Sequence, residues 1–284
     1  MYQAGLVLEG GGLKGVYTAG VLDFFLDKDL DFSSIYGVSA GACNMCSYLS
    51  KQKGRSRDVN IDYLDSRRYC SAESLLLTGD LFNVDICYHL IPDYLYPFDY
   101  DTFDKYTGKA YSVVTDIVTG RPEYLRIRDL HKDMDKIRAS ASLPLVARTV
   151  KIDGKSYLDG GLSDSIPLRK SIVDGNRKNV VVMTKEIGYI KEPAGAANLA
   201  LLKARYFRYP KVYELIKNRH FAYNACVKYI EEQQAKGEVF VIRPKTKSNV
   251  CRIEKDKEKL LAFYEAGYQD AKDSYEDLLK YLEK

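Results

Sequence analysis

The sequence predicts an α/β domain in which helices cover both faces of a central sheet. Short apolar, β-branched runs alternate with helically spaced apolar residues along the 284-residue chain, which is the pattern of this fold class. Residues 180–184 form a continuous apolar run of the kind found in buried parallel strands. No linker, internal repeat or low-complexity tract interrupts the pattern, so we expect a single domain over residues 1–284.

The first third of the chain predicts two strand–turn–helix units in succession. Apolar runs and helical spacing give, in order, a strand at 6–8, a helix at 16–26, a strand at 34–36 and a helix at 40–49. Residues 51–69 are highly charged and predict a solvated helix and loop. Both turns follow a strand, so if the strands are parallel neighbours, the turns lie at the same edge of the sheet.

The rest of the chain predicts hairpins, further strands and helices. The expected elements are strands at 110–118 and 123–127, a helix at 129–137, a hairpin at 150–158 with an Asp-Gly turn, strands at 180–184 and 238–243, and helices at 255–284. Between them, residues 82–106 are rich in Tyr and Phe. Pro92 and Pro97 argue against a long regular helix there. This aromatic segment is either a surface layer or a wall or lid of an apolar cleft.

Composition narrows the classes of function. A formal charge of +4 without a concentrated basic face does not indicate a nucleic-acid binder. No apolar run is long enough for a transmembrane helix, and no secretory signal is apparent, so we expect a cytoplasmic protein. Cys43 and Cys46 form C-x-x-C without a second ligand pair, which favours free thiols over a metal site. Residues 203–219 form a basic amphipathic pattern that either packs on the domain or contacts a membrane surface.

The first glycine-rich turn has two interpretations. Gly10, Gly12 and Gly15 match the G-x-G-x-x-G fingerprint of dinucleotide-binding proteins. The acidic residue that should follow the second strand is missing, so a dinucleotide is not expected. The alternative is an anion hole, because Gly10, Gly11 and Gly12 at a helix start leave backbone N–H groups unshielded.

The second turn carries a candidate nucleophile. Gly37, Ser39 and Gly41 form G-x-S-x-G, a pattern that exposes a serine hydroxyl on a tight strand-to-helix turn. A serine that attacks an ester creates an oxyanion, which the N–H groups of the first turn can stabilise. The two turns together therefore predict the two halves of an acyl-transfer site.

The serine needs a base, and the sequence offers two. Asp159 follows the 150–158 hairpin and is succeeded by Gly160 and Gly161, which present a carboxylate with little steric cover. Alone, Asp159 could accept the Ser39 proton directly. The order Ser39, Asp159, His220 also fits a Ser–Asp–His esterase, although His220 lies within a basic helical pattern rather than in a loop after a strand.

Three motifs in order resemble patatin-like phospholipases: G-G-G-x-x-G at 10–15, G-x-S-x-G at 37–41 and D-G-G at 159–161. The small-residue segment 139–144 is also similar to that family. The resemblance implies a three-layer α/β/α sandwich with a mostly parallel sheet, and a motif-bearing core of about residues 5–185, followed by a strand and helices over 186–284. Asp164 and Ser165 depart from the asparagines that many members have.

The resemblance also implies an activity. It implies metal-independent hydrolysis of lipid acyl esters by a Ser39–Asp159 dyad, with an oxyanion hole at Gly10–Gly12, no cofactor, and a lipid substrate at or near a membrane. A non-catalytic lipid-binding protein on the same fold is the remaining alternative. Four cations near the motifs could contact a lipid phosphate, but isolated surface charges are more typical at such positions, so we do not expect them in the site: Lys14, Arg148, Arg169 and Lys170.

Overall fold

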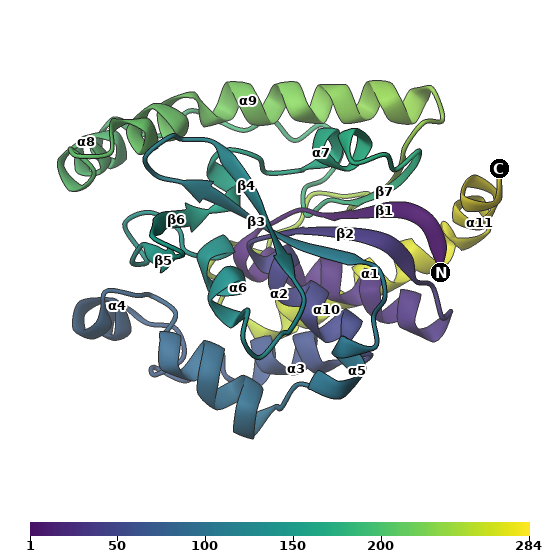
Figure 1. Ribbon diagram of the computed structural model, residues 1–284, viewed down its shortest axis with the longest axis horizontal. Helices are drawn as coiled ribbons and strands as arrows, with labels where there is room; N and C mark the ends of the chain where they lie inside the picture. Colours follow the sequence, from purple (N-terminus) through teal and green to yellow (C-terminus); the bar gives the residue numbers. More distant parts are fainter.

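The computed structural model describes residues 1–284 and contains an eight-stranded sheet between two layers of helices (Figure 1). The strand order is β5-β6-β3-β2-β1-β7-β8, with β4 paired to β3. The strands are β1 (Tyr2–Leu8), β2 (Phe32–Val38), β3 (Lys109–Asp116), β4 (Pro122–Ile127), β5 (Val150–Ile152), β6 (Lys155–Asp159), β7 (Lys178–Val182) and β8 (Phe240–Ile242). The α/β sandwich predicted from the sequence is confirmed.

The parallel part of the sheet places both glycine-containing turns at one edge. Strand β1 lies between β2 and β7, and Leu8 is paired with Gly37 on one side and Val182 on the other. All three strands run in the same direction, so their carboxyl ends meet. The predicted hairpins are confirmed as the antiparallel pairs β3–β4 and β5–β6.

Alternation along the central strands divides the core into two. In β1, Leu6 and Leu8 belong to the larger hydrophobic cluster, whereas Val7 between them belongs to the second cluster on the opposite face. Successive side chains of a strand point to opposite faces, and both faces here are apolar. Helices must therefore cover the sheet on both sides.

The larger cluster lies under the helices that follow the two turns and under the helices near the end of the chain. Helix α10 packs along α1 in this layer (Figure 1). The helices of this layer are α1 (Val16–Asp27), α2 (Ala40–Leu49), α3 (Arg55–Asp62), α6 (Met134–Ser140), α10 (Lys257–Asp273) and α11 (Tyr275–Glu283). Helix α6 begins later than the predicted residue 129 because residues 129–133 form a turn held by the Asp133 carboxylate.

The opposite layer is built from α7 (Leu168–Val173) and α9 (Pro210–Ala235), with α8 (Ala196–Arg205) at the end of α9 (Figure 1). Tyr223, Val227 and Ile230 of α9 are buried against the second cluster. The basic amphipathic segment at 203–219 therefore belongs largely to helices packed on the domain. No helix combines the length and the apolar composition needed to span a membrane.

An outer segment extends the first layer beyond the sheet. It comprises α4 (Ala72–Thr78), the π-helix η2 (Ile86–Leu95) and α5 (Tyr100–Asp104). No long regular helix forms here, as Pro92 and Pro97 predicted: η2 is a short π-helix that contains Pro92, and an irregular stretch with Pro97 separates it from α5. The wider i→i+5 pattern of a π-helix leaves room for a residue that lacks an N–H.

Candidate active site

Strand β3 brings the two predicted catalytic residues to one place. Val38, the last residue of β2, is paired with Val113, and Asp159, the last residue of β6, is paired with Val114. Strand β4 occupies the other edge of β3, so β2 and β6 share one edge and approach each other from opposite directions. Ser39 and Asp159 follow where the two strands meet, and both line a small cavity of about 30 Å³.

Ser39 occupies a strained turn. Its backbone has φ 54° and ψ −123°, a conformation that a residue with a Cβ rarely adopts. The Ser39 N–H donates to the Ser140 hydroxyl at 2.8 Å, and that hydroxyl donates to the Val113 carbonyl at 2.6 Å. Ser140, in the small-residue segment, thus ties the turn to β3 and holds it in place.

Two motif glycines are required by close approach. A Cβ on Gly10 would lie 2.8 Å from the Ser39 Cβ, and a Cβ on Gly160 would lie 2.2 Å from the Val113 carbonyl oxygen. Without these side chains, the first turn can lie against Ser39 and the chain after Asp159 can lie against β3. The other motif glycines are also closely packed: Gly15, Gly37, Gly41 and Gly161.

The first glycine turn presents unpaired backbone donors to the same cavity. The N–H groups on either side are engaged, that of Glu9 with the Val182 carbonyl and that of Leu13 with the Arg252 carbonyl. Between them, the N–H groups of Gly10–Gly12 have no acceptor within the protein. All three glycines line the cavity that holds Ser39, next to the 3₁₀ turn η1 (Gly12–Gly15).

The Asp159 carboxyl group is buried and only partly hydrogen-bonded. Oδ1 accepts the Gly161 N–H at 2.7 Å, within the short turn η3 (Gly160–Leu162), whereas Oδ2 has no partner of hydrogen-bond geometry. Burial raises the pKa of Asp159, and the neighbouring Ser39 hydroxyl and Arg219 guanidinium partly offset that rise. Oδ2 is therefore a free acceptor close to Ser39, and catalytic hydrogen bonds are often long before substrate binds.

His220 does not reach this place. It lines neither of the two cavities that contain Ser39, its Nδ1 has no hydrogen-bond partner, and its ring lies against Phe221. The preceding residue of α9, Arg219, lines both cavities. No group of three or more His, Cys, Asp or Glu side chains in the chain is arranged to hold a metal ion.

The polar side of the small cavity was not predicted from the sequence. Four cationic side chains from beyond β7 line it: Lys185, Lys191, Arg219 and Arg252. Glu9 also lies there, where it accepts hydrogen bonds from Tyr223 and from Thr184. None of these residues belongs to a recognisable motif, so no local signal could have identified them.

Ser39 also lines a larger, mostly apolar cavity of about 490 Å³. Its volume is typical of small-molecule sites, which span about 300–1,000 Å³. The aromatic segment contributes Phe82, Tyr88 and Phe98 to its lining, together with Ile91 of η2. The interpretation of this segment as a wall of an apolar cleft is therefore confirmed.

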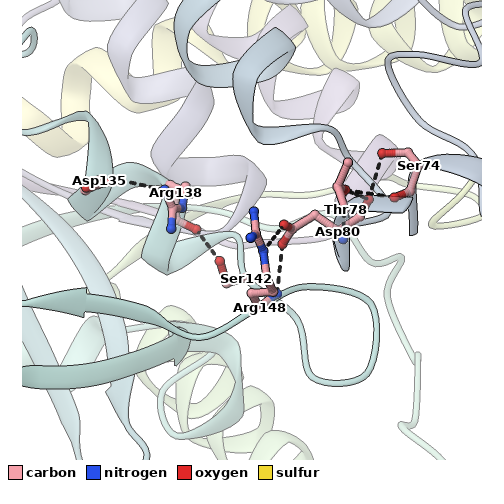
Figure 2. Close-up of polar contacts among 7 residues, drawn as sticks. All are labelled: Ser74, Thr78, Asp80, Asp135, Arg138, Ser142 and Arg148. Atoms are coloured by element: carbon pink, nitrogen blue, oxygen red, sulfur yellow. Dashed lines mark hydrogen bonds and ion pairs between the residues drawn. The ribbon is translucent and has the colours of Figure 1, made fainter. Parts of the chain in front are cut away.

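A buried carboxylate fastens the outer segment to the rim of this cavity (Figure 2). Asp80 accepts the Arg148 N–H at 2.8 Å and the Arg148 Nε at 2.6 Å, and next to it the Leu81 N–H donates to the Val146 carbonyl. Arg148 is thus engaged in a structural ion pair. The Asp80 backbone carbonyl accepts the Ser74 hydroxyl, which links α4 to the same point (Figure 2).

Comparison with known proteins shows which families the chain resembles. Residues 6–171 match the family model described as patatin-like phospholipase, and residues 209–283 match a domain of unknown function, DUF6363. The chain is 30% identical over 246 residues to the uncharacterized protein YjjU of Escherichia coli K12, covering 84% of this chain and 68% of that protein.

Two other comparisons are more distant. A probable lipid hydrolase, 463L of Invertebrate iridescent virus 6, is 24% identical over 192 residues, covering 63% of this chain and 66% of the viral protein. VipD from Legionella pneumophila aligns in structure with a TM-score of 0.46 at 12% identity, covering all of this chain and 67% of VipD. The patatin-like family model itself spans more than half of the sequence, so the chain belongs to the patatin-like phospholipase family of lipid hydrolases.

Proposed function

We propose that this protein is a serine acyl hydrolase of lipids that uses a Ser39–Asp159 dyad. The observation that carries the proposal is the meeting of β2 and β6 along β3, which brings a serine on a strained turn and a buried carboxylate into one cavity. The unpaired N–H groups of Gly10–Gly12 in the same cavity support an oxyanion hole.

The acylation step follows from these groups. Ser39 Oγ attacks the carbonyl carbon of the ester while its proton passes to Oδ2 of Asp159. The negative charge that develops on the carbonyl oxygen is stabilised by the glycine N–H groups. The tetrahedral intermediate then breaks the ester bond, and the departing alcohol takes the proton from Asp159.

Deacylation repeats the chemistry with water. Asp159 removes a proton from a water molecule, whose oxygen attacks the acyl-Ser39 carbonyl. Collapse of the second tetrahedral intermediate releases the fatty acid and returns the proton to Ser39. The raised pKa of Asp159 suits a group that must take up and release a proton in both steps.

The apolar cavity supports a lipid acyl chain as the substrate group. Ser39 lies at its border, and hydrophobic side chains make up most of its lining. Exposed apolar side chains gather on the adjoining outer segment, with Leu76 and Leu77 of α4 86% and 74% exposed and Tyr94 of η2 77% exposed. We assign this surface, rather than residues 203–219, to peripheral contact with a lipid surface.

Substitution of the dyad tests the proposal. Ser39→Ala and Asp159→Asn should each lower kcat/KM for p-nitrophenyl butyrate by about a thousandfold or more, because nucleophile and base act as a unit. A fluorophosphonate probe should label the wild-type protein at Ser39, as shown by peptide mass spectrometry. His220→Gln, whose side chain lines neither cavity, is the matched control and should leave both readouts unchanged.

Three results would contradict the proposal. Full activity in Ser39→Ala or in Asp159→Asn would show that a Ser39–Asp159 dyad does not catalyse the reaction. Loss of activity in His220→Gln comparable to that in Ser39→Ala would favour the Ser–Asp–His esterase. Absence of labelling at Ser39 in folded protein, together with absence of ester hydrolysis, would favour a lipid-binding protein without catalysis.

A further inference from the structure

The polar cavity beside Ser39 concentrates positive charge. It is lined by Lys185, Lys191, Arg219 and Arg252, all of which lie beyond the segment that matches the patatin-like family model. Arg219 and Arg252 come from the segment that matches a domain of unknown function. The catalytic motifs and these four cations thus come from different parts of the chain and meet at one point.

These cations have no anionic partner in the protein. None of the four side chains forms an ion pair or donates a hydrogen bond, and the ammonium groups of Lys185 and Lys191 lie over the rings of Tyr189 and Tyr223, 5.4 and 4.6 Å from the ring centroids. Lys185 is only 6% exposed and the Nε of Arg219 is buried without an acceptor, whereas Lys191 is half-buried and Arg252 is exposed at the mouth of the cavity. Buried cations are normally paired, so the unpaired Lys185 and Arg219 beside a cavity indicate a missing anion.

The two carboxylates of the cavity are already engaged. Glu9 accepts hydrogen bonds from the Tyr223 hydroxyl and from the N–H and hydroxyl of Thr184, and Oδ1 of Asp159 accepts the Gly161 N–H. Four cations therefore face two carboxylates, and the cavity carries a net positive charge.

Burial and the neighbouring positive charges lower the pKa values of Lys185 and Lys191. Burial lowers the pKa of Lys185 to about 8, with Lys14 adding to the effect, while Glu9 opposes it. Burial also lowers the pKa of Lys191 to about 7, with further lowering by Arg219, Arg252 and Lys185. A bound anion would restore the charge of both lysines.

We propose that Lys185, Lys191, Arg219 and Arg252 form an anion-binding subsite that holds a phosphate group on the alcohol side of the ester substrate. Ser39, Arg219 and Arg252 line both cavities, of which the larger is mostly apolar and the smaller also contains Lys185 and Lys191. An acyl ester of a phosphate-bearing alcohol has the matching polarity. Arginine binds phosphate through paired N–H groups and lysine binds it as a point charge.

This inference rests on the proposed hydrolase function and gives the segment at 209–283 a role. Through Arg219 and Arg252, that segment would select substrates by their head group, while the motifs in the first part of the chain carry out the chemistry. The four cations are specificity-determining residues, which hold the part of the substrate that leaves as the alcohol.

Binding is tested first, without catalysis. In the Ser39→Ala protein, inorganic phosphate and glycerol 3-phosphate should each bind in titration calorimetry at constant ionic strength, whereas glycerol should not. Adding Arg252→Gln or Lys191→Gln should weaken phosphate binding about tenfold or more, because each removes a charge-assisted contact. Lys236→Gln is the matched control, since Lys236 is exposed at the end of α9 and lines neither cavity.

Substrate preference is tested second and distinguishes a lipid head group from free phosphate. Oleoylglycerol 3-phosphate and oleoylglycerol, at equal mole fraction in neutral detergent micelles, differ only in the phosphate. The wild-type protein should favour the phosphate ester in kcat/KM, and Arg252→Gln or Lys191→Gln should lower that ratio about tenfold. Lys236→Gln should leave the ratio unchanged.

Several outcomes would overturn the inference. These are no phosphate binding to the Ser39→Ala protein, binding that survives both Arg252→Gln and Lys191→Gln, and binding of free phosphate with no change in the substrate ratio. The hydrolase proposal fails by a different result, which is hydrolysis of both oleoyl esters by Ser39→Ala. Phosphate binding is measured by calorimetry without an ester substrate, so its outcome does not depend on whether the hydrolase proposal holds.

Discussion

Asp159 is a buried carboxylate whose two oxygens receive a single hydrogen bond of good geometry, from Gly161. Burial raises its pKa above the ordinary aspartate value. The folded state then binds the proton more tightly than the unfolded state does, so stability falls as pH rises from the unfolded pKa through the folded one. At neutral pH this carboxylate lowers the free energy of unfolding, as does the strained backbone of Ser39.

Because the buried Asp159 carboxylate lowers the free energy of unfolding at neutral pH, its replacement by a neutral side chain should stabilise the protein. Asp159→Asn removes the buried charge, so it should raise the melting temperature at pH 7–8 while abolishing activity. The difference from wild type should shrink as the pH falls through the raised pKa, because the wild-type carboxyl group becomes neutral there. Calorimetric melting curves of both proteins at a series of pH values measure this difference in melting temperature.

A surface aspartate provides the control for that measurement. Asp277, whose side chain is 75% exposed in its pair with Lys280, should change stability by no more than about 0.5 kcal/mol when replaced by Asn. A variant at Asp159 that melts below wild type at every pH would contradict the assignment of a destabilising charge.

At the residue scale, the sequence predicted what depends on local chain geometry. Ser39 and Asp159 were identifiable because each lies in a tight turn whose glycines leave a pattern in consecutive positions. Arg219 and Arg252 leave no such pattern, because their place in the cavity is set by how distant elements pack. His220 fitted by order along the chain alone, and a helix turns consecutive side chains in different directions, so Arg219 faces the cavity instead.

At the element scale, β3 is the strand that determines where the two turns meet. Its partners change along one edge, from β2 at Val113 to β6 at Val114. The sequence predicted these strands and both hairpins, since alternation and the Asp153-Gly154 turn are local signals. It did not predict the change of partner, which depends on the register of strands far apart in the chain. At η2, Pro92 and Pro97 correctly argued against a long regular helix, but the sequence did not predict the short π-helix that contains Pro92.

The Asp80–Arg148 contact predicts how the outer segment can be loosened. Asp80→Ala removes the acceptor of the Arg148 N–H and of its guanidinium, which should lower the free energy of unfolding by about 1–3 kcal/mol. The Leu81 amide, bonded to the Val146 carbonyl nearby, should also exchange its hydrogen faster. Chemical denaturation and hydrogen exchange by mass spectrometry measure the two effects.

An exposed ion pair is the matched comparison. Lys132 is 82% exposed in its pair with Asp129, so Lys132→Gln should change stability by no more than about 0.5 kcal/mol. Equal effects of Asp80→Ala and Lys132→Gln would show that the Asp80 contact does not fasten the outer segment.

At the scale of the whole molecule, the outer segment beside the apolar cavity carries exposed apolar side chains. Leu76, Leu77 and Tyr94 are exposed on α4 and η2, the elements of the outer segment that leads into the cavity wall. Burying one leucine in an apolar environment contributes about 1.5–3 kcal/mol. This surface is therefore suited to resting on a lipid interface while an acyl chain moves into the cavity.

Paired substitutions test that contact. Leu76→Ser with Leu77→Ser should weaken binding to phosphatidylcholine–phosphatidylglycerol vesicles about tenfold or more in a sedimentation assay, because two exposed apolar side chains are lost. Val173→Ser, at an 80% exposed position on α7, is the control and should bind as wild type does. Undiminished vesicle binding by the double variant would assign membrane contact to another surface.

The Glu9–Tyr223 hydrogen bond has a consequence for the order in which the chain can fold. It joins residues 214 positions apart, and the Tyr17–Asp270 bond between α1 and α10 spans 253. A ribosome delivers the first strand and its glycine turn long before α9 and α10 emerge. Until those helices arrive, the face of the first strand that carries Val7 lacks its cover from α9, and α1 lacks its cover from α10. Such distant contacts slow folding, so the nascent chain exposes these apolar faces until the last third of the chain has been made.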